Sequence, residues 1–127
     1  MEFKIKAIDR GNFIQMQFFG EWTEMDSEEV FAEMAKSILA SGHKKVLFDY
    51  RDTKFMEDSF FMDKSEAEAL SRMPNVFEFR FASVFKSETE VARFKYWESI
   101  ATSRAVKIKF FSNYVDAEAW LLKTNSH

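Results

Sequence analysis

The chain has 127 residues, enough for one domain, since a domain of about 150 residues buries nearly 70% of its unfolded surface. We expect residues 1–127 to form a single domain. Of these residues 46% are hydrophobic and 16 are Phe, which predicts an aromatic core. A formal net charge of −3 argues against nucleic-acid binding, which needs a concentrated positive field. The absence of cysteine excludes disulfides, thiolate nucleophiles and most structural zinc sites.

The sequence lacks the apolar stretches of secreted and membrane-spanning proteins. Its first ten residues alternate lysine with apolar side chains and contain no apolar signal-peptide region. No apolar run approaches the roughly 18 residues that a membrane-spanning helix requires. We therefore expect a cytoplasmic protein without a membrane span.

Two alternating segments predict an N-terminal hairpin. Residues 3–7 and 14–18 each alternate apolar and polar side chains, which is typical of strands with one wet face, and Gln15 and Gln17 lie on that wet face. The turn from Asp9 to Asn12 contains Gly11 and joins the two strands.

A helix follows the hairpin. Apolar residues at spacings of three and four from Val30 to Ile38 form one face of a helix. Asp26 with Glu29 resembles a capping box at its start, and Gly42 is a suitable C-cap.

The central strand is predicted over Lys45 to Asp49. Its continuous apolar run is typical of a strand covered on both faces, and Asp49 is expected where that run meets solvent. A second helix is expected to begin between Asp58 and Ser65 and to end before Pro74, because the residue before proline disfavours the α region.

The last third predicts two more strand–helix units. Residues 79–85 form a strand, and Ser87 with Glu90 resembles a capping box that opens a helix to about Ala101. Residues 105–111 form an edge strand protected by lysines, and Asn113 caps the last helix. The predicted class is α/β, in the order ββαβαβαβα: a five-stranded mixed sheet with an N-terminal antiparallel hairpin, parallel later strands and four helices.

The segment after the central strand resembles a motif of the STAS domains, which are named for sulfate transporters and anti-sigma-factor antagonists. Those domains carry a Phe-Met-Asp-Ser-Ser-Gly-Leu type of motif at this place. In this chain, residues 55–61 read Phe-Met-Glu-Asp-Ser-Phe-Phe. Phe55, Met56 and Ser59 match, Glu57 is a conservative change, and Asp58 and Phe60 replace a serine and the glycine.

The end of the chain is similar to the SpoIIAA-like branch of the same superfamily. That branch ends in a strand and a short helix with an Asp, acidic-Ala, Trp-Leu pattern, here residues 116–121. The resemblance covers nearly the whole chain in element order. It implies a STAS/SpoIIAA-like fold and a non-enzymatic regulatory module that binds another protein through the junction of the third strand and second helix.

Ser59 aligns with the serine that anti-sigma-factor antagonists use as a phosphorylation switch, so the resemblance implies a phospho-acceptor role. A phosphate adds about −1.5 to −2 charges, and helix N-termini favour anions. Glu57 and Asp58 already place negative charge there, however, and Phe60 removes a small residue beside the hydroxyl. A simple N-cap at Asp58 or Ser59 is the alternative.

Adjacent apolar residues predict a binding surface at the same junction. A helix cannot turn Phe60, Phe61 and Met62 toward one sheet, because neighbours differ by about 100°. At least one should therefore face a groove, a partner or solvent. The candidate partner or ligand surface consists of Phe55, Met56, Glu57, Asp58, Phe60 and Phe61. The alternative function is a carrier or sensor of a small apolar ligand in an aromatic-lined pocket.

No enzyme chemistry is predicted. The acids Asp49, Asp52, Glu57 and Asp58 could form a site for Mg²⁺ or Ca²⁺, but the spacing of Asp49 and Asp52 misses that of aspartate-based phosphoryl transfer. Nearby lysines and arginines predict ordinary surface pairing, so we expect these acids to be solvated. The only histidines are His43, beside the predicted Gly42 cap, and His127, the last residue of the sequence, so no catalytic triad or two-histidine metal site is expected.

The remaining expectations concern tyrosines and partners. Tyr50, Tyr96 and Tyr114 are expected to be half-buried rings without a charged partner. We predict no catalytic residue, metal or cofactor, and expect a protein partner and no nucleic acid. Homo-oligomerisation is left open.

Overall fold

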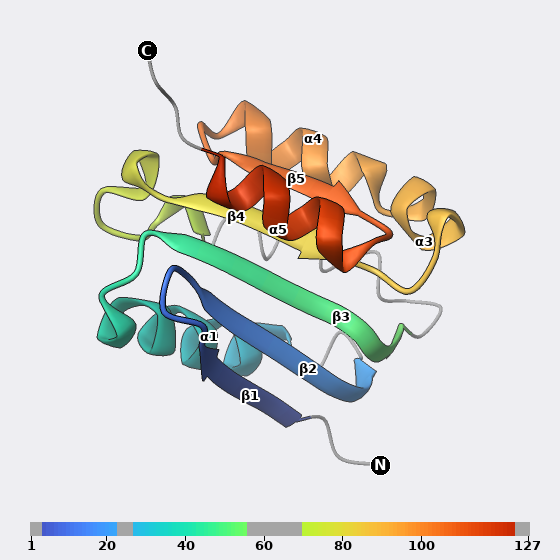
Figure 1. Ribbon diagram of the computed structural model, residues 1–127, viewed down its shortest axis with the longest axis horizontal. Coiled ribbons are helices and arrows are strands. Elements are labelled where there is room, and N and C mark those ends of the chain that lie inside the picture. Colours follow the sequence, from blue (N-terminus) through green and yellow to red (C-terminus); the bar gives the residue numbers. More distant parts are fainter. Residues whose placement is uncertain (1–3, 23–26, 56–69, 124–127) are drawn as a thin grey trace.

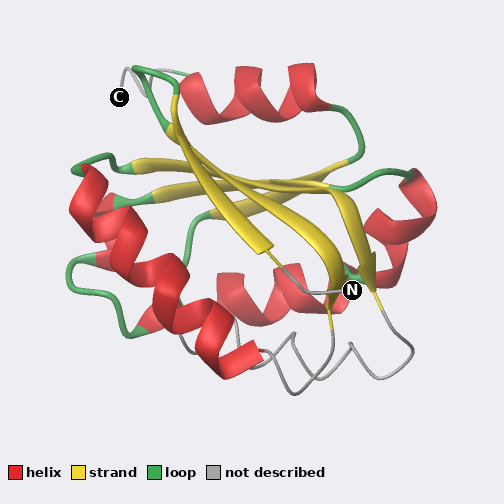
Figure 2. Cartoon of the chain, turned by 90° about the horizontal axis from the view of Figure 1, so that it is seen from below, coloured by secondary structure: helices red, strands yellow, loops and turns green. Residues whose placement is uncertain are grey.

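The structure is a computed structural model that describes residues 4–22, 27–55 and 70–123. These residues form a mixed sheet with helices on both faces (Figures 1 and 2). The strands are β1 (Lys4–Asp9), β2 (Ile14–Trp22), β3 (Lys45–Phe55), β4 (Arg80–Val84) and β5 (Ile108–Phe111). The helices are α1 (Ser27–Ser41), α3 (Glu88–Arg93), α4 (Lys95–Ser103) and α5 (Tyr114–Leu122), with a 3₁₀ turn η3 (Val76–Glu78).

The strands lie in sequence order, β1-β2-β3-β4-β5. β1 and β2 are antiparallel, and every later pairing is parallel. In the turn between β1 and β2, Gly11 adopts a positive φ of 89° and its backbone N–H donates to Asp9 Oδ1 at 2.8 Å. The predicted α/β class, five-stranded mixed sheet and N-terminal antiparallel hairpin are confirmed, and the described residues contain four α-helices.

The two faces of the sheet differ in what covers them. On one face, α1 and α4 enclose a large aromatic core, whereas on the other α5 packs Ala117 and Leu121 against Leu47 and Ala82. Figure 1 shows α5 in front of β4 and β5, while no described helix lies in front of β1 and β2. We call the α5 side of β2 and β3 the open face; it carries Gln15, Gln17, Asp49, Arg51 and Asp52. Among the described helices, none combines the length and apolar character needed to cross a membrane.

The prediction that β3 ends at Asp49 is wrong, since the strand continues to Phe55. β2 extends equally far, and the two strands remain paired up to Trp22 and Phe55. Pairing of β3 with β4, in contrast, stops where Asp49 lies opposite Val84. The polar run after Asp49 stays in a strand because β2 continues to supply hydrogen-bond partners, not because of its own composition.

The helix predicted as one element from Ser87 to Ala101 is two, α3 and α4, separated at Phe94. Phe94 leaves helical geometry at φ −100° and ψ 15° and is fully buried, with its ring 4.6 Å from that of Phe55. Phe94 and Trp97, three residues apart across this break, are both fully buried in the core.

Other boundaries agree more closely with the sequence. Ser87 and Asn113 accept hydrogen bonds from the N–H groups of Glu90 and Asp116, so both predicted N-caps are confirmed. β5 begins at Ile108, later than expected, because the preceding turn places Ala105 at a positive φ of 64°. Most of the predicted second helix lies outside the described residues, which are helical at 70–71.

Candidate functional site

Asp49 is the most unusual residue of the open face, because its carboxylate is fully buried in the middle of β3. A buried charge is costly unless hydrogen bonds and an opposite charge compensate it. Asp49 Oδ1 accepts from the backbone N–H of Arg51 at 3.1 Å and from Arg51 Nε at 2.9 Å. Oδ2 accepts from Arg51 Nη2 at 2.8 Å and from Gln15 Nε2 at 3.0 Å. These four bonds use the full accepting capacity of a carboxylate.

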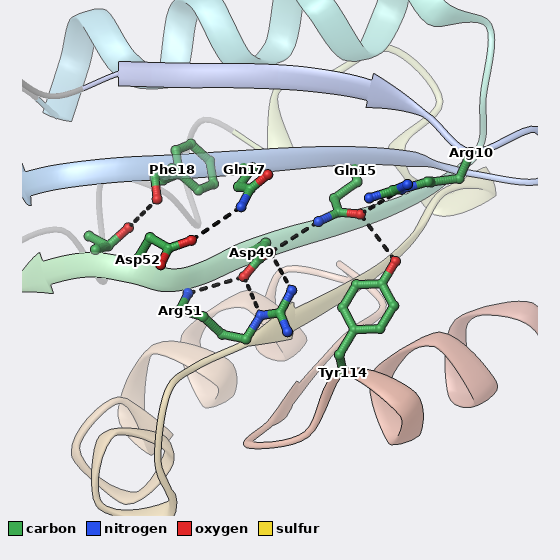
Figure 3. Close-up of polar contacts among 9 residues, drawn as sticks. Arg10, Gln15, Gln17, Phe18, Asp49, Arg51, Asp52 and Tyr114 are labelled. Carbon is green, nitrogen blue, oxygen red and sulfur yellow. Dashed lines mark hydrogen bonds and ion pairs between the residues drawn. The ribbon is translucent and has the colours of Figure 1, made fainter.

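Gln15 of β2 connects Asp49 to two other parts of the chain. While its amide nitrogen donates to Asp49, its Oε1 accepts from Arg10 Nε at 2.9 Å and from the Tyr114 hydroxyl at 3.1 Å. Figure 3 shows these side chains converging from the hairpin turn, β2, β3 and the start of α5. Gln15 is therefore the centre of a polar network that ties α5 to the N-terminal hairpin.

Arg51 lies on the solvent side of this network. Its side chain is 43% exposed, and its guanidinium lies 4.8 Å from the centre of the Tyr114 ring. Hydrogen bonding to Asp49 raises the pKa of Arg51 further above its ordinary value, which keeps the guanidinium charged. Burial raises the pKa of Tyr114, so its hydroxyl remains a donor to Gln15 at neutral pH.

A β-bulge brings Asp52 to the same face as Asp49. Gln17 pairs with Asp49 and Phe19 with Asp52, so β3 carries one extra residue against β2. Consequently Gln17 Nε2 donates to Asp52 Oδ2 at 3.2 Å, beside the Gln15–Asp49 bond (Figure 3). The Thr53 hydroxyl donates to the Phe18 carbonyl at 3.0 Å within the bulge.

This arrangement gives the buried Asp49 carboxylate a structural role. Asp49 has no accepting capacity left for a substrate proton or a metal ion. Within residues 4–22, 27–55 and 70–123, no three acids or histidines come together in a way that could hold a metal. The exposed groups of the site are the Arg51 guanidinium, the Asp52 carboxylate and the Gln17 amide, which suit polar contacts with a partner.

Three sequence predictions about these residues are wrong. Asp49 was expected to meet solvent and Gln15 to lie on a wet face, yet both are buried. Tyr114 was expected to lack a charged partner, yet its ring lies beside the Arg51 guanidinium. The available signal was a charged residue inside the apolar run VLFDY, because an acid there needs partners from elsewhere in the fold.

His43 contacts both the end of α1 and the turn between β1 and β2. Its backbone N–H donates to the hydroxyl of Ser41, the last residue of α1, at 3.1 Å. Its side-chain Nε2 lies 3.0 Å from Asp9 Oδ1 and so connects the end of α1 to the hairpin turn.

Of the predicted partner surface, only Phe55 lies among the described residues. Phe55 is 8% exposed, and its ring packs against Trp22, Tyr50, Phe85 and Phe94. Its ring therefore belongs to the core at the end of β3. Met56, Glu57, Asp58, Ser59, Phe60 and Phe61 lie outside the described residues, and their roles stay predictions.

Comparison with known proteins identifies the fold. No protein-family model matches the sequence, and no curated protein is significantly similar to it. Among solved structures, an anti-sigma factor antagonist from Mycobacterium paratuberculosis has a TM-score of 0.69 and 10% identity, covering 96% of each chain. An uncharacterised protein with a SpoIIAA-like fold from Shewanella loihica has a TM-score of 0.59 and 20% identity, covering 94% of this chain and 93% of its own.

A third similar structure is the phosphorylated form of the Bacillus cell fate determinant SpoIIAA. It has a TM-score of 0.53 and 14% identity, and the match covers 94% of this chain and 98% of that one. These matches extend over nearly the whole chain at low identity. The chain therefore has the SpoIIAA-like fold, as the sequence resemblance implied.

Proposed function

We propose that this chain is a non-enzymatic regulatory module that binds another protein. Its contact surface consists of the exposed end of β3 and the junction that follows, residues 51–61. The similar structures that are anti-sigma factor antagonists support a regulatory role by analogy of fold. The saturated carboxylate of Asp49 supports a role without catalysis.

The observation that carries this proposal is the extension of β3 beyond β4. After Asp49, the strand continues to Phe55 with no further β4 pairing. Arg51, Asp52 and Lys54 are exposed along it, whereas Thr53 and Phe55 anchor it in the core. The paired strand β3 thus holds charged side chains directly before the motif that resembles the STAS switch. Side chains presented by a hydrogen-bonded strand need less ordering when a partner binds.

Ser59 is the proposed point of regulation. One similar structure is the phosphorylated form of SpoIIAA, and Ser59 matches the switch serine in the sequence motif. A phosphate there would add about −1.5 to −2 charges next to Glu57 and Asp58. We expect this added charge to weaken binding of the partner and so to act as a release signal.

Affinity capture from the native host tests the proposed surface. The tagged full chain, Ser59→Ala, Ser59→Glu and Lys54→Glu serve as baits, with Ser99→Glu as a matched control on exposed α4. A specific partner should be recovered with the wild type, Ser59→Ala and Ser99→Glu, and lost or strongly reduced with Ser59→Glu and Lys54→Glu. Equal recovery by all five baits would contradict the proposed surface.

Mass spectrometry of chain purified from its native host tests the switch itself. We expect a phosphorylated fraction of the peptide that contains Ser59, and this fraction should be absent from the partner complex. A persistently unmodified Ser59, together with partner binding unaffected by Ser59→Glu, would remove the switch but leave partner binding standing.

The alternative of an apolar carrier gains no support from the described residues. The aromatic rings around Phe55 contact one another and fill the core.

A further inference from the structure

A positively charged cavity lies at the opposite end of the sheet from the proposed partner surface. It forms where β3, β4 and β5 begin and α5 ends, and has a volume of about 240 Å³. Its described lining consists of Lys44, Lys45, Glu78, Phe79, Arg80, Lys107 and Lys123. These residues come from four separate segments, so the fold and not a local run of lysines gathers the charge.

The charge of this cavity is opposite to that of the whole chain. Five cations face one carboxylate, a formal net charge of four positive, in a chain whose net charge is −3. The one carboxylate, Glu78, pairs with Lys44 at 3.5 Å, and both side chains are about half exposed. Exposed ion pairs of this kind are weak, so the Lys44–Glu78 pair can give way to a bound anion and the lining keeps its net positive charge.

Arg80 is held in place before any ligand binds. Its guanidinium lies 4.0 Å from the centre of the Trp120 ring, and its Nε donates to the Trp120 carbonyl at 3.2 Å. Its backbone N–H donates to the Lys44 carbonyl at 2.8 Å. A preordered guanidinium loses less entropy on binding an anion, and its planar donors match phosphate oxygens. Buried Phe79 forms an apolar part of the lining.

We propose that this cavity binds a small soluble molecule that carries two phosphate groups. Two phosphates bring about −3 to −4 charges, which balances the four net positive charges of the lining. A single inorganic phosphate would leave about half of that charge uncompensated. The site is distinct from the β3 junction and does not depend on the proposed partner binding.

Isothermal titration calorimetry of the full chain with inorganic pyrophosphate tests this inference. Pyrophosphate should bind and raise the melting temperature, because a ligand of the native state stabilises it. Orthophosphate at the same ionic strength should bind at least tenfold more weakly. Trp120 fluorescence should respond to pyrophosphate because Arg80 stacks on this ring, and Trp120→Phe should abolish the response.

Charge-removing variants locate the site. Lys107→Gln and Lys45→Gln should each weaken pyrophosphate binding about fivefold to tenfold, the effect expected for losing one charge-assisted contact. Lys109→Gln is the matched control, since Lys109 is an exposed lysine of β5, two residues after Lys107, and lies outside the cavity lining. It should change affinity less than twofold. Thermal unfolding confirms that each variant is folded.

Two results would overturn the inference. One is equal weakening by Lys107→Gln, Lys45→Gln and Lys109→Gln, which would indicate a diffuse response to net charge. The other is binding to phosphatidylcholine vesicles that contain phosphatidic acid, without binding to pyrophosphate, which would indicate a membrane surface. Absence of any pyrophosphate binding at low salt equally refutes the proposal.

Discussion

The Arg51 guanidinium binds the buried Asp49 carboxylate with two parallel hydrogen bonds, Nε to Oδ1 at 2.9 Å and Nη2 to Oδ2 at 2.8 Å. The two residues are separated by one position, so in a regular strand their side chains would simply lie side by side on one face. The bulge that follows Asp49 lets the Arg51 backbone N–H bind the same carboxylate. This pair therefore fixes both the bulge and the exposed end of β3.

Removal of the Asp49 carboxylate should strongly destabilise the fold. Asp49→Ala leaves Arg51 and the buried Gln15 amide without their acceptor, so we expect the free energy of unfolding to fall by about 3 kcal/mol. Asp52→Ala removes an exposed acid from the same strand and should cost less than about 0.5 kcal/mol. Urea unfolding followed by circular dichroism measures both. Similar losses in the two variants would contradict the central role of Asp49.

The coupling between Asp49 and Arg51 can be measured in a double-mutant cycle. Residues that share a hydrogen-bonded ion pair typically show coupling energies of about 0.5–3 kcal/mol. We expect Asp49→Ala and Arg51→Gln together to cost clearly less than the sum of the two single variants. Additive losses would indicate that Asp49 is stabilised mainly by Gln15.

The buried hydroxyl of Ser83 offers a site for stabilisation. Ser83 is fully buried on β4, and among the described residues its Oγ has no hydrogen-bond partner. Because an unpaired buried hydroxyl is costly, Ser83→Ala should raise the free energy of unfolding by about 1 kcal/mol. Thr53→Val is the matched control: it removes a buried hydroxyl that donates to the Phe18 carbonyl, and should lower stability by about 1 kcal/mol. Loss of stability in Ser83→Ala would mean that its hydroxyl is satisfied in solution.

The two confirmed N-caps should each contribute measurably to stability. Ser87→Ala and Asn113→Ala remove side-chain acceptors for Glu90 N–H and Asp116 N–H, at about 1 kcal/mol each. Ser99→Ala removes a hydroxyl within the exposed part of α4 and should be neutral or slightly stabilising. Thermal or urea unfolding distinguishes these outcomes, and cap variants as stable as Ser99→Ala would refute the capping role.

The features that were predictable from sequence depend on local chemistry. Gly11 with Asp9 specifies the hairpin turn, and Ser87 and Asn113 mark helix starts, because each acts within a few residues of itself. The parallel pairing followed from the alternation of strands and helices.

The features that were missed depend on contacts between distant segments. Asp49 is buried because Gln15, Arg51 and the start of α5 cover it, and the Gln15–Tyr114 bond joins residues 99 positions apart. β3 continues past Asp49 because β2 does the same. The break at Phe94 reflects packing against Phe55 and Phe85, which helix propensity does not contain.

The Asp9–His43 pair predicts a specific pH dependence of stability. The pKa of Asp9 is lowered below its ordinary value of 3.8, first by the Gly11 backbone N–H and then by His43. A lowered native pKa means that the native state binds fewer protons than the unfolded state, so the contribution is fully present above the ordinary pKa. It is lost as the pH falls through the lowered value.

Urea midpoints of the wild type and Asp9→Asn test this dependence. Their difference should be larger above the ordinary pKa of Asp than below it, and should shrink as the pH falls through the lowered pKa of Asp9, where the carboxyl becomes protonated. His43→Gln should retain part of the dependence, because the larger cause, the Gly11 N–H, is still present. A difference that is the same at low and neutral pH would show that the Asp9 charge does not stabilise the turn.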